Sequence, residues 1–382
     1  MMKKKWTLLF YLNGNNDLGL EMENTFLDLC NSSFNDDINI VIEIGKAPLN
    51  IVKMVRLREC YYKEDWSGVR RYAIINNSLK LEEILENKNM ADYKELNDFI
   101  SWGMKEFPAE RYLVSISGHG FIVASLSDLC SERPYIMGLY EMTLALNTIK
   151  EQNIDILILD ICNMNTVETL YELGSKSKNP VKNLLTYVGD GPLEGISYGS
   201  MIKYLNDDDT KVILNNMVSG FNYNLVALDV NHSKLKKLKT IVNEFSFRLL
   251  NKEISDFSYY DKMIQQIIDK LVICHKAEKN KKTLLNLISA KDMNDKSKCD
   301  FFRFYKKLAF LRNNYWWNIA MSLDDKGVSS KLYKPTLEYL DCRQLALFIL
   351  LYNETLTFEE AMDISKTIFI KLNWINEVKT GY

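Results

Sequence analysis

Short apolar runs alternate along this chain with longer segments in which apolar and polar residues follow a helical period. The most apolar run spans residues 154–162 and reads Ile-Asp-Ile-Leu-Ile-Leu-Asp-Ile-Cys. A run of this length that is rich in Ile and Leu predicts a strand buried on both faces, as in a parallel sheet. Runs of the same kind predict further strands at residues 6–12, 38–44, 111–117, 182–189 and 224–230.

Helical periodicity fills most of the intervals between these runs. It predicts helices at residues 18–31, 91–107 and 139–151, and another that begins after residue 162 with Asn165 or Thr166 as its cap. Residues 52–57 and 69–75 are expected to pair as a hairpin, and residues 121–137 are expected to form a loop. Strands that alternate with helices predict a three-layer α/β domain with a mainly parallel sheet.

After about residue 255 the pattern becomes helix-rich. We therefore predict one α/β domain over residues 1–254 and a helix-rich C-terminal region over residues 255–382 that packs on it. The helices expected in this region span residues 259–275, 301–313, 336–352 and 357–372, with a charged link at 276–282 and an alternative strand at 338–341.

Two chemically competent side chains follow neighbouring strands of the predicted sheet. Cys162 ends the run 154–162, and His119 follows the run 111–117 within Gly-His-Gly. If the two strands are parallel neighbours, both side chains project from the carboxyl edge of the sheet, where α/β proteins bind ligands. A cysteine at a strand end is most often a small buried hydrophobe, but a histidine at the matching position favours a nucleophile with its general acid and base.

The backbone around Cys162 is expected to assist that chemistry. Backbone N–H groups and the dipole of the following helix are predicted to favour the thiolate form of Cys162. In an acyl-transfer reaction, the N–H groups of Gly120 and Cys162 would form the oxyanion hole.

Two carboxylates are expected near the same edge. Asp160 precedes Cys162 by two positions and so faces the same side of the strand, where it could also cap the next helix or orient a loop. Asp190 ends the next predicted strand. Two carboxylates in a partly buried pocket repel each other unless a cation enters, so such a pocket favours a Lys or Arg side chain.

The motifs around these residues resemble the clostripain family of cysteine peptidases, which belongs to the caspase-like group. The similar segments are Ser-Gly-His-Gly at 117–120, the stretch from Leu159 to Leu173, and the opening strand and turn at 6–18. The resemblance covers roughly residues 6–235. It implies a caspase-like domain and a cysteine endopeptidase that cleaves after Arg or Lys, with Asp160 lining the pocket for the basic side chain.

The resemblance also raises two questions, whether the protein binds calcium and whether it cuts its own chain. Some relatives need calcium, and Asp17, Glu21 and Glu23 could be ligands, but we interpret them as helix-surface acids and expect neither cofactor nor metal. Relatives often cut themselves at a basic residue between the histidine and the cysteine. Arg133 is the only basic residue between His119 and Lys150, and Pro134 follows it, so we expect the chain to work uncut.

Two other classes of function remain open. Phe121-Ile122-Val123 stand where the family often has small residues, so the protein could bind basic peptides in the same groove without cutting them. A nucleotide-binding protein ranks last, because no Gly-x-Gly-x-x-Gly or Walker loop follows the first strand.

Composition limits the partners. The formal net charge of −2, from 48 basic and 50 acidic residues, gives no overall field that would favour nucleic acid or a membrane. Seven cysteines without a Cys-x-x-Cys pair, and only three histidines, argue against a structural zinc site and fit a reducing compartment. The basic start before residues 6–12 lacks a cleavage signal, so we expect a cytoplasmic protein, with unconventional export as the open alternative. Its expected partners are peptides or proteins with basic residues.

Overall fold

The computed structural model describes most of the first 275 residues and part of the C-terminal end. The described residues are 3–53, 60–85, 88–121, 124–131, 133, 136–150, 152–162, 164–188, 190–250, 258–275, 345–346, 349–350 and 356–372.

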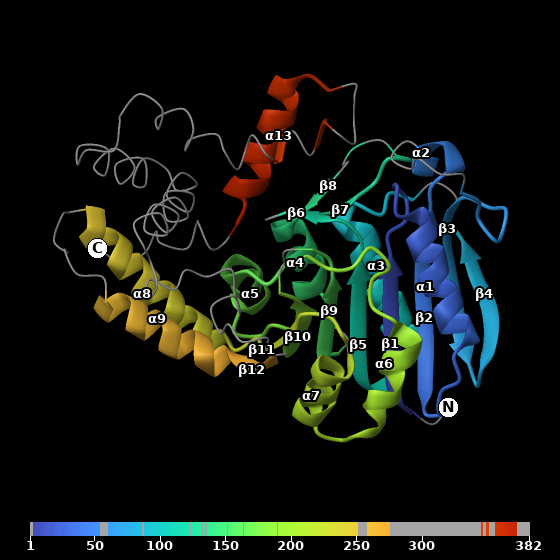
Figure 1. Cartoon of the computed structure of the whole chain (residues 1–382), viewed down its shortest axis with the longest axis horizontal. Helices are drawn as coiled ribbons and strands as arrows, with labels where there is room; N and C mark the ends of the chain where they lie inside the picture. Colours follow the sequence, from blue (N-terminus) through green and yellow to red (C-terminus); the bar gives the residue numbers. More distant parts are fainter. Residues whose placement is uncertain are drawn as a thin grey trace.

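A nine-stranded sheet forms the centre of this described part (Figure 1). Its strands are β1 (Lys4–Leu12), β2 (Ile38–Lys46), β3 (Gly68–Ile75), β4 (Ser78–Ile84), β5 (Ala109–Ser117), β9 (Ile156–Asp160), β10 (Asn183–Tyr187), β11 (Leu225–Asp229) and β12 (Val272–His275). The spatial order is β12-β11-β10-β9-β5-β1-β2-β3-β4. The five central strands, from β2 to β10, run parallel, and each edge carries two antiparallel strands. All six strands predicted from apolar runs are confirmed.

The central strands are apolar because both of their faces are covered. Every residue of β2 and of β9 is buried. Along β2 the side chains alternate between two cores, with Val41 in one and Ile40 and Ile42 in the other. Two covered faces explain why these strands read as continuous apolar runs.

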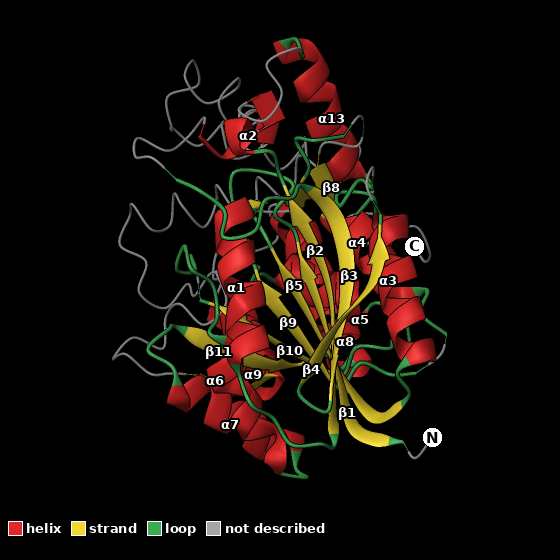
Figure 2. Ribbon diagram, turned by 90° about the vertical axis from the view of Figure 1, so that its right-hand side faces the viewer, coloured by secondary structure: helices red, strands yellow, loops and turns green. Residues whose placement is uncertain are grey.

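Helices form the two outer layers. The first layer comprises α1 (Gly19–Asn31), α6 (Tyr198–Met201) and α7 (Thr210–Gly220). The second comprises α3 (Tyr93–Glu106), α4 (Leu139–Asn147), α5 (Val167–Gly174) and α8 (His232–Leu250). Figure 2 views the sheet nearly edge-on, with α1, α6 and α7 on one side and α3 and α4 on the other. The predicted three-layer α/β architecture is confirmed.

The expected hairpin between residues 52–57 and 69–75 is wrong. Val52 and Lys53 belong to α2 (Leu49–Lys53), and residues 54–59 lie outside the described part. Strand β3 instead pairs with β4 across Asn76 and Asn77, whose φ angles are 50° and 58°. Asparagine tolerates this left-handed conformation, which tight hairpin turns require.

Residues 121–137 are not a simple loop. They contribute to a small antiparallel sheet of β6 (Gly120–Phe121), β7 (Ala124–Ser127) and β8 (Ile136–Gly138), with order β6-β7-β8. In Figure 1 this small sheet lies above the large one, at the end where β5 finishes. Three strands this short carry no periodicity that a sequence pattern could detect.

The predicted helix at 259–275 ends early. Helix α9 (Ser258–Leu271) is followed by β12, which pairs antiparallel with β11 and extends the large sheet. The domain boundary at 254/255 stays a prediction, since residues 251–257 and 276–344 lie outside the described part. The expected segments at 276–282, 301–313 and 338–341, and most of 336–352, also lie there.

The last predicted helix is present as α13 (Phe358–Ile370). Its residues Ala361, Met362 and Ile368 are buried in the same core as α3 and α4. No helix in the described ranges is long and apolar enough to cross a membrane.

Candidate active site

His119 and Cys162 lie at the same level of two adjacent parallel strands. Ser117 of β5 is the register partner of Asp160 of β9, and each candidate follows its strand end by two residues. The Gly118 N–H donates to the Asp160 carbonyl at 3.3 Å, so the paired geometry continues past the strands. A Cβ at position 120 would lie 2.8 Å from the Cys162 carbonyl oxygen. The segment after His119 therefore packs directly on the backbone of Cys162.

The Cys162 thiol is partly buried and touches one backbone donor. The Gly191 N–H donates to Sγ at 3.4 Å. Burial raises the pKa of the Cys162 thiol, the Gly191 hydrogen bond lowers it, and the negative charges of Asp190 and Asp160 raise it further. The net result is a pKa above the ordinary value.

Of the two influences expected to favour the thiolate, a backbone N–H is present at Gly191 and lowers the pKa of Cys162, but burial and the two carboxylates outweigh it. Helix α5 begins at Val167, and its cap is Thr166, whose hydroxyl accepts from the Thr169 N–H. The dipole acts mainly within the first turn, and several residues separate that turn from Cys162. The capping prediction for Thr166 is confirmed.

His119 contacts a carboxylate that the sequence analysis assigned to a helix surface. Its Nε2 lies 2.9 Å from Asp17 Oδ1, with 26% and 17% of the two side chains exposed. Asp17 lies just after β1, which pairs with β5 on the side opposite to β9. The contact depends on β1 being the neighbour of β5. Local sequence patterns do not give the order of the strands, so they could not predict it.

Asp160 is more deeply buried than expected for a residue that lines a substrate pocket. The residue is 7% exposed, and its carboxylate accepts hydrogen bonds from the hydroxyls of Tyr187 at 2.6 Å and Tyr198 at 2.8 Å. The Ile196 N–H and the Ser117 hydroxyl also donate to it, each at 3.2 Å. Burial raises the pKa of the Asp160 carboxyl, and these hydrogen bonds oppose that rise. Asp160 therefore anchors the 195–198 segment over the site, as its alternative role of orienting a loop predicted.

Asp190 occupies a more open position. It is exposed, follows β10 and immediately precedes Gly191, whose N–H contacts the Cys162 sulfur. The second candidate carboxylate thus lies beside the thiol on the surface of the protein.

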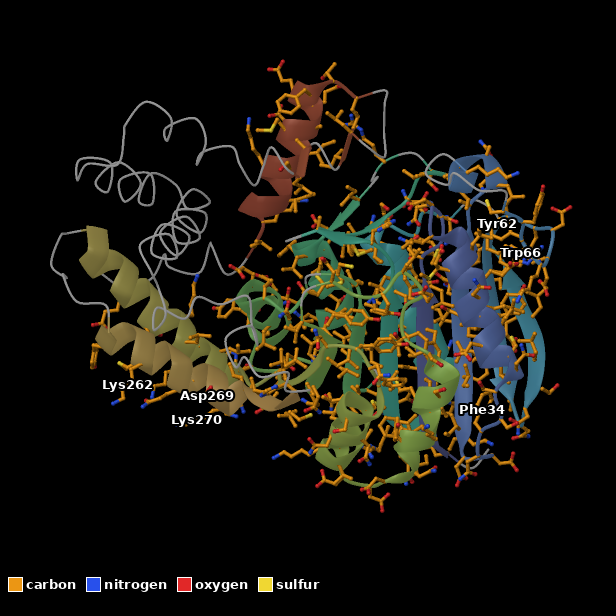
Figure 3. All side chains as sticks on the ribbon, in the orientation of Figure 1. Phe34, Tyr62, Trp66, Lys262, Asp269 and Lys270 are labelled. Carbon is orange, nitrogen blue, oxygen red and sulfur yellow. The ribbon has the colours of Figure 1, made fainter. Side chains whose placement is uncertain are left out.

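The interpretation of Glu21 and Glu23 as surface acids is wrong, because both are buried. Glu23 forms an ion pair with Lys46 at 2.6 Å. The Lys46 ammonium lies 4.1 Å and 4.3 Å from the ring centroids of Tyr62 and Trp66, which Figure 3 labels beside α1. Within the described ranges, no group of three or more His, Cys, Asp or Glu side chains is placed to hold a metal ion.

A three-layer sandwich with a His and a Cys level at the carboxyl edge of its sheet is the arrangement of caspase-like cysteine peptidases. The family model described as the clostripain family, peptidase C11, matches residues 11–314. The chain therefore belongs to the clostripain family of cysteine peptidases. No individually curated protein shows a significant match to it.

Solved structures of the same family share this fold. A secreted C11 cysteine protease from Bacteroides thetaiotaomicron, "iotapain", is 14% identical, with a TM-score of 0.53 over 72% of this chain and 87% of that one. The same type of protease in complex with an irreversible peptide inhibitor is 13% identical, with a TM-score of 0.53 over 84% and 99%. An inactive zymogen C11 protease from Parabacteroides distasonis is 13% identical, with a TM-score of 0.56 over 84% and 99%.

Proposed function

We propose that this protein is a cysteine endopeptidase that uses His119 and Cys162 and cleaves after Arg or Lys. The observation that carries the proposal is the pairing of Ser117 with Asp160, which sets the two residues level on neighbouring strands. Family membership supports the reaction class, and the contact of Gly191 with the Cys162 sulfur supports a thiol poised at the same edge.

The reaction follows from the roles that these groups can take. The Cys162 thiolate attacks the scissile carbonyl carbon, and the N–H groups of Gly120 and Cys162 receive the resulting oxyanion. The His119 imidazolium gives its proton to the leaving amine, and the C–N bond breaks to leave a thioester. Water then attacks the thioester while His119 takes its proton, which releases the acid and restores Cys162.

Burial of Cys162 makes the histidine essential to this scheme. The thiol pKa is raised by burial, so the neutral thiol dominates without a neighbouring cation. An imidazolium at His119 is such a cation, and it also carries the proton that is donated to the leaving amine.

Asp190 and Asp160 contribute to the specificity for Arg and Lys in different ways. Asp190 is exposed beside the thiol, so it is the carboxylate that meets the substrate cation directly. Asp160 already accepts four hydrogen bonds, and its part is to hold the surrounding segment and to contribute a buried negative charge. Substrates are peptides or proteins that present Arg or Lys.

One observation favours the alternative of a peptidase-like protein that binds basic peptides without cutting them. A half-buried thiol with a raised pKa is a poor nucleophile. The segment Phe121–Val123 that first suggested this alternative lies largely outside the described part.

Hydrolysis of internally quenched peptides separates the two possibilities. We expect Cys162→Ala and His119→Ala each to lower turnover of Arg and Lys peptides by about 10³-fold or more, since each removes a bond-making group. Cys274→Ala is the matched control, because this thiol lies in β12 at the far edge of the sheet. Undiminished turnover in Cys162→Ala would overturn the assignment, and binding of the same peptides without any product would favour the alternative.

A further inference from the structure

We propose that Asp17 is a positioning residue for His119, so that the dyad becomes a carboxylate–histidine–cysteine triad that follows three neighbouring strands. The inference rests on the proposed function and adds a member to its site. Asp17 follows β1, His119 follows β5 and Cys162 follows β9, and these three strands are adjacent and parallel.

The contact fixes the protonation geometry of the histidine ring. An ionised carboxylate can only accept, so the 2.9 Å contact between Asp17 Oδ1 and His119 Nε2 requires a proton on Nε2. Neutral His119 is then the Nε2–H tautomer, and Nδ1 is the basic nitrogen. Nδ1 is therefore the atom that exchanges protons with the Cys162 thiol and with the leaving amine.

The loop that holds Asp17 is fixed by buried asparagine side chains. Asn13 and Asn16 are fully buried, and the side-chain amide of each donates to the Ser127 carbonyl at 2.9 Å. The Asn16 side-chain oxygen also accepts from the Leu18 N–H at 2.9 Å, on the far side of Asp17. Hydrogen bonds therefore fix the backbone on both sides of Asp17.

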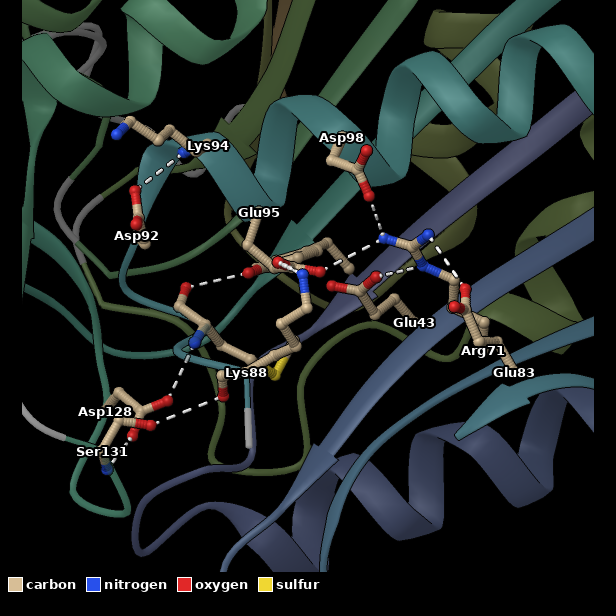
Figure 4. A network of polar contacts seen from close by, with 12 residues as sticks. Glu43, Arg71, Glu83, Lys88, Asp92, Lys94, Glu95, Asp98, Asp128 and Ser131 are labelled. Carbon is tan, nitrogen blue, oxygen red and sulfur yellow. Dashed lines mark hydrogen bonds and ion pairs between the residues drawn. The ribbon is translucent and has the colours of Figure 1, made fainter. Parts of the chain in front are cut away.

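A second tie joins this loop to Asp128. Asn15 donates to the fully buried Asp128 carboxylate at 2.9 Å, and the Asn15 carbonyl accepts from the Leu129 N–H at 2.8 Å. Asp128 also accepts from the backbone N–H groups of Met90 and Ser131, at 2.8 Å and 2.9 Å. Figure 4 shows Asp128 between the segment at Lys88 and Ser131.

The same scaffold reaches the histidine. The Asn13 N–H donates to the carbonyl of Ser117, two residues before His119, at 3.0 Å. The His119 carbonyl accepts from the Leu126 N–H at 2.9 Å, within the small sheet. Both partners of the carboxylate–imidazole contact are therefore mounted on one rigid framework, as a precise catalytic orientation requires.

Kinetics test the role of Asp17. We expect Asp17→Ala to lower kcat for an Arg peptide about 10- to 100-fold with little change in KM, a part of what general acid–base catalysis contributes. Asp17→Asn should recover part of the loss, because its amide oxygen can still accept from Nε2–H. Asp208→Asn is the control, an exposed carboxylate paired with Lys5, for which we expect wild-type kinetics.

Histidine NMR reports the same contact without any turnover. The chain has three histidines, so His119→Ala identifies the signals of His119 in a sample with ¹⁵N-labelled histidine. We expect a slowly exchanging Nε2 proton in the wild type, whether the imidazole is neutral or protonated, and loss of that protected proton in Asp17→Ala. An unchanged His119 spectrum in Asp17→Ala, or a changed spectrum with kcat within twofold, would overturn the proposal. If the wild type shows no hydrolysis, the function fails while the spectrum still decides the contact.

Discussion

At the scale of single residues, the environment of Cys162 sets the conditions under which the site can work. Its thiol is half-buried, receives one hydrogen bond from Gly191, and has two carboxylates nearby. Three of these four influences raise the thiol pKa. We therefore expect Cys162 to be a weak nucleophile unless the protonated form of His119 lies beside it.

This balance predicts a pH dependence for alkylation of Cys162. A raised pKa means that the thiolate forms at higher pH than in an ordinary cysteine, whose pKa is about 8.5. In His119→Ala we therefore expect the iodoacetamide reaction at Cys162 to reach half its maximum rate above that pH. In the wild type we expect reaction at lower pH, because the imidazolium stabilises the thiolate. Peptide mass spectrometry isolates Cys162 from the other cysteines, and a half-maximum at or below the ordinary value in His119→Ala contradicts the account.

The two carboxylates predict two different phenotypes. We expect Asp190→Asn to lower kcat/KM for Arg and Lys peptides by about 2- to 5-fold, equivalent to about 0.4–1 kcal/mol for an exposed charge pair, with the fold and neutral substrates unaffected. We expect Asp160→Asn to lower the thermal midpoint and the turnover of all substrates together, because it disturbs four hydrogen bonds. Equal kinetics for basic and neutral residues before the cut in the wild type would eliminate the pocket.

The residues that were predictable from the sequence are those that directly follow a strong strand pattern. His119 and Cys162 each follow a buried apolar run, so topology alone brings them to one edge. Asp17 and Tyr198 reach the site from other elements, through the order of strands and the course of a loop. Local periodicity contains no information on such contacts.

At the scale of elements, a buried ion-pair cluster joins strands β2 and β3 to helix α3. Arg71 of β3 donates to Glu43 of β2 at 2.6 Å and to Glu95 and Asp98 of α3 at 3.2 Å and 2.8 Å, as Figure 4 shows. The side chains of Arg71 and Glu43 are 4% and 0% exposed. A guanidinium suits this position because its five N–H donors lie in one plane and can bind several carboxylates at once.

Removal of this guanidinium is expected to destabilise the folded protein. We expect Arg71→Met to lower the free energy of unfolding by about 3–5 kcal/mol, because Glu43 stays buried without its cation, whereas Glu95 keeps its ion pair with Lys88. Urea unfolding followed by circular dichroism measures the change. Lys80→Met is the control, since Lys80 is 66% exposed in its ion pair with Glu82, and we expect a change of about 0–1 kcal/mol. Equal effects of the two substitutions would contradict the buried cluster.

Elements without an apolar run were the ones that sequence patterns missed. Strand β4 reads Ser-Leu-Lys-Leu-Glu-Glu-Ile and lies at the sheet edge, where Leu79 and Leu81 stay 46% and 43% exposed. Strand β12 continues directly from α9 and covers four residues, so the helical period masks it. These strands are defined by the neighbour they pair with rather than by their own composition.

At the scale of the whole molecule, helix α13 packs against β8 of the small sheet and against α4. Ile368 of α13 packs at Gly138 of β8, where an added Cβ would come within 3.1 Å of its side chain. Lys371 forms an ion pair with Glu141 of α4. The loop that contains Arg133 runs between β7 and β8, so both its ends belong to a packed sheet.

This arrangement predicts that the protein works as one uncut chain. The bond after Arg133 precedes Pro134, which has no N–H and restricts the backbone of the residue before it, so peptidases cut it poorly. We expect the intact mass to stay unchanged during prolonged incubation at full activity. A fragment that begins at Pro134, absent in Cys162→Ala, would show self-processing instead.

Covalent labelling with a peptidyl acyloxymethyl ketone that carries Arg at its reactive end reports the nucleophile and the specificity of the site in one measurement. The account predicts one probe per chain, attached to Cys162 in peptide maps. It further predicts no labelling of Cys162→Ala, normal labelling of Cys274→Ala, and slow labelling by the analogue with Gln in place of Arg. Labelling at another cysteine, or equal labelling of Cys162→Ala and the wild type, would contradict it.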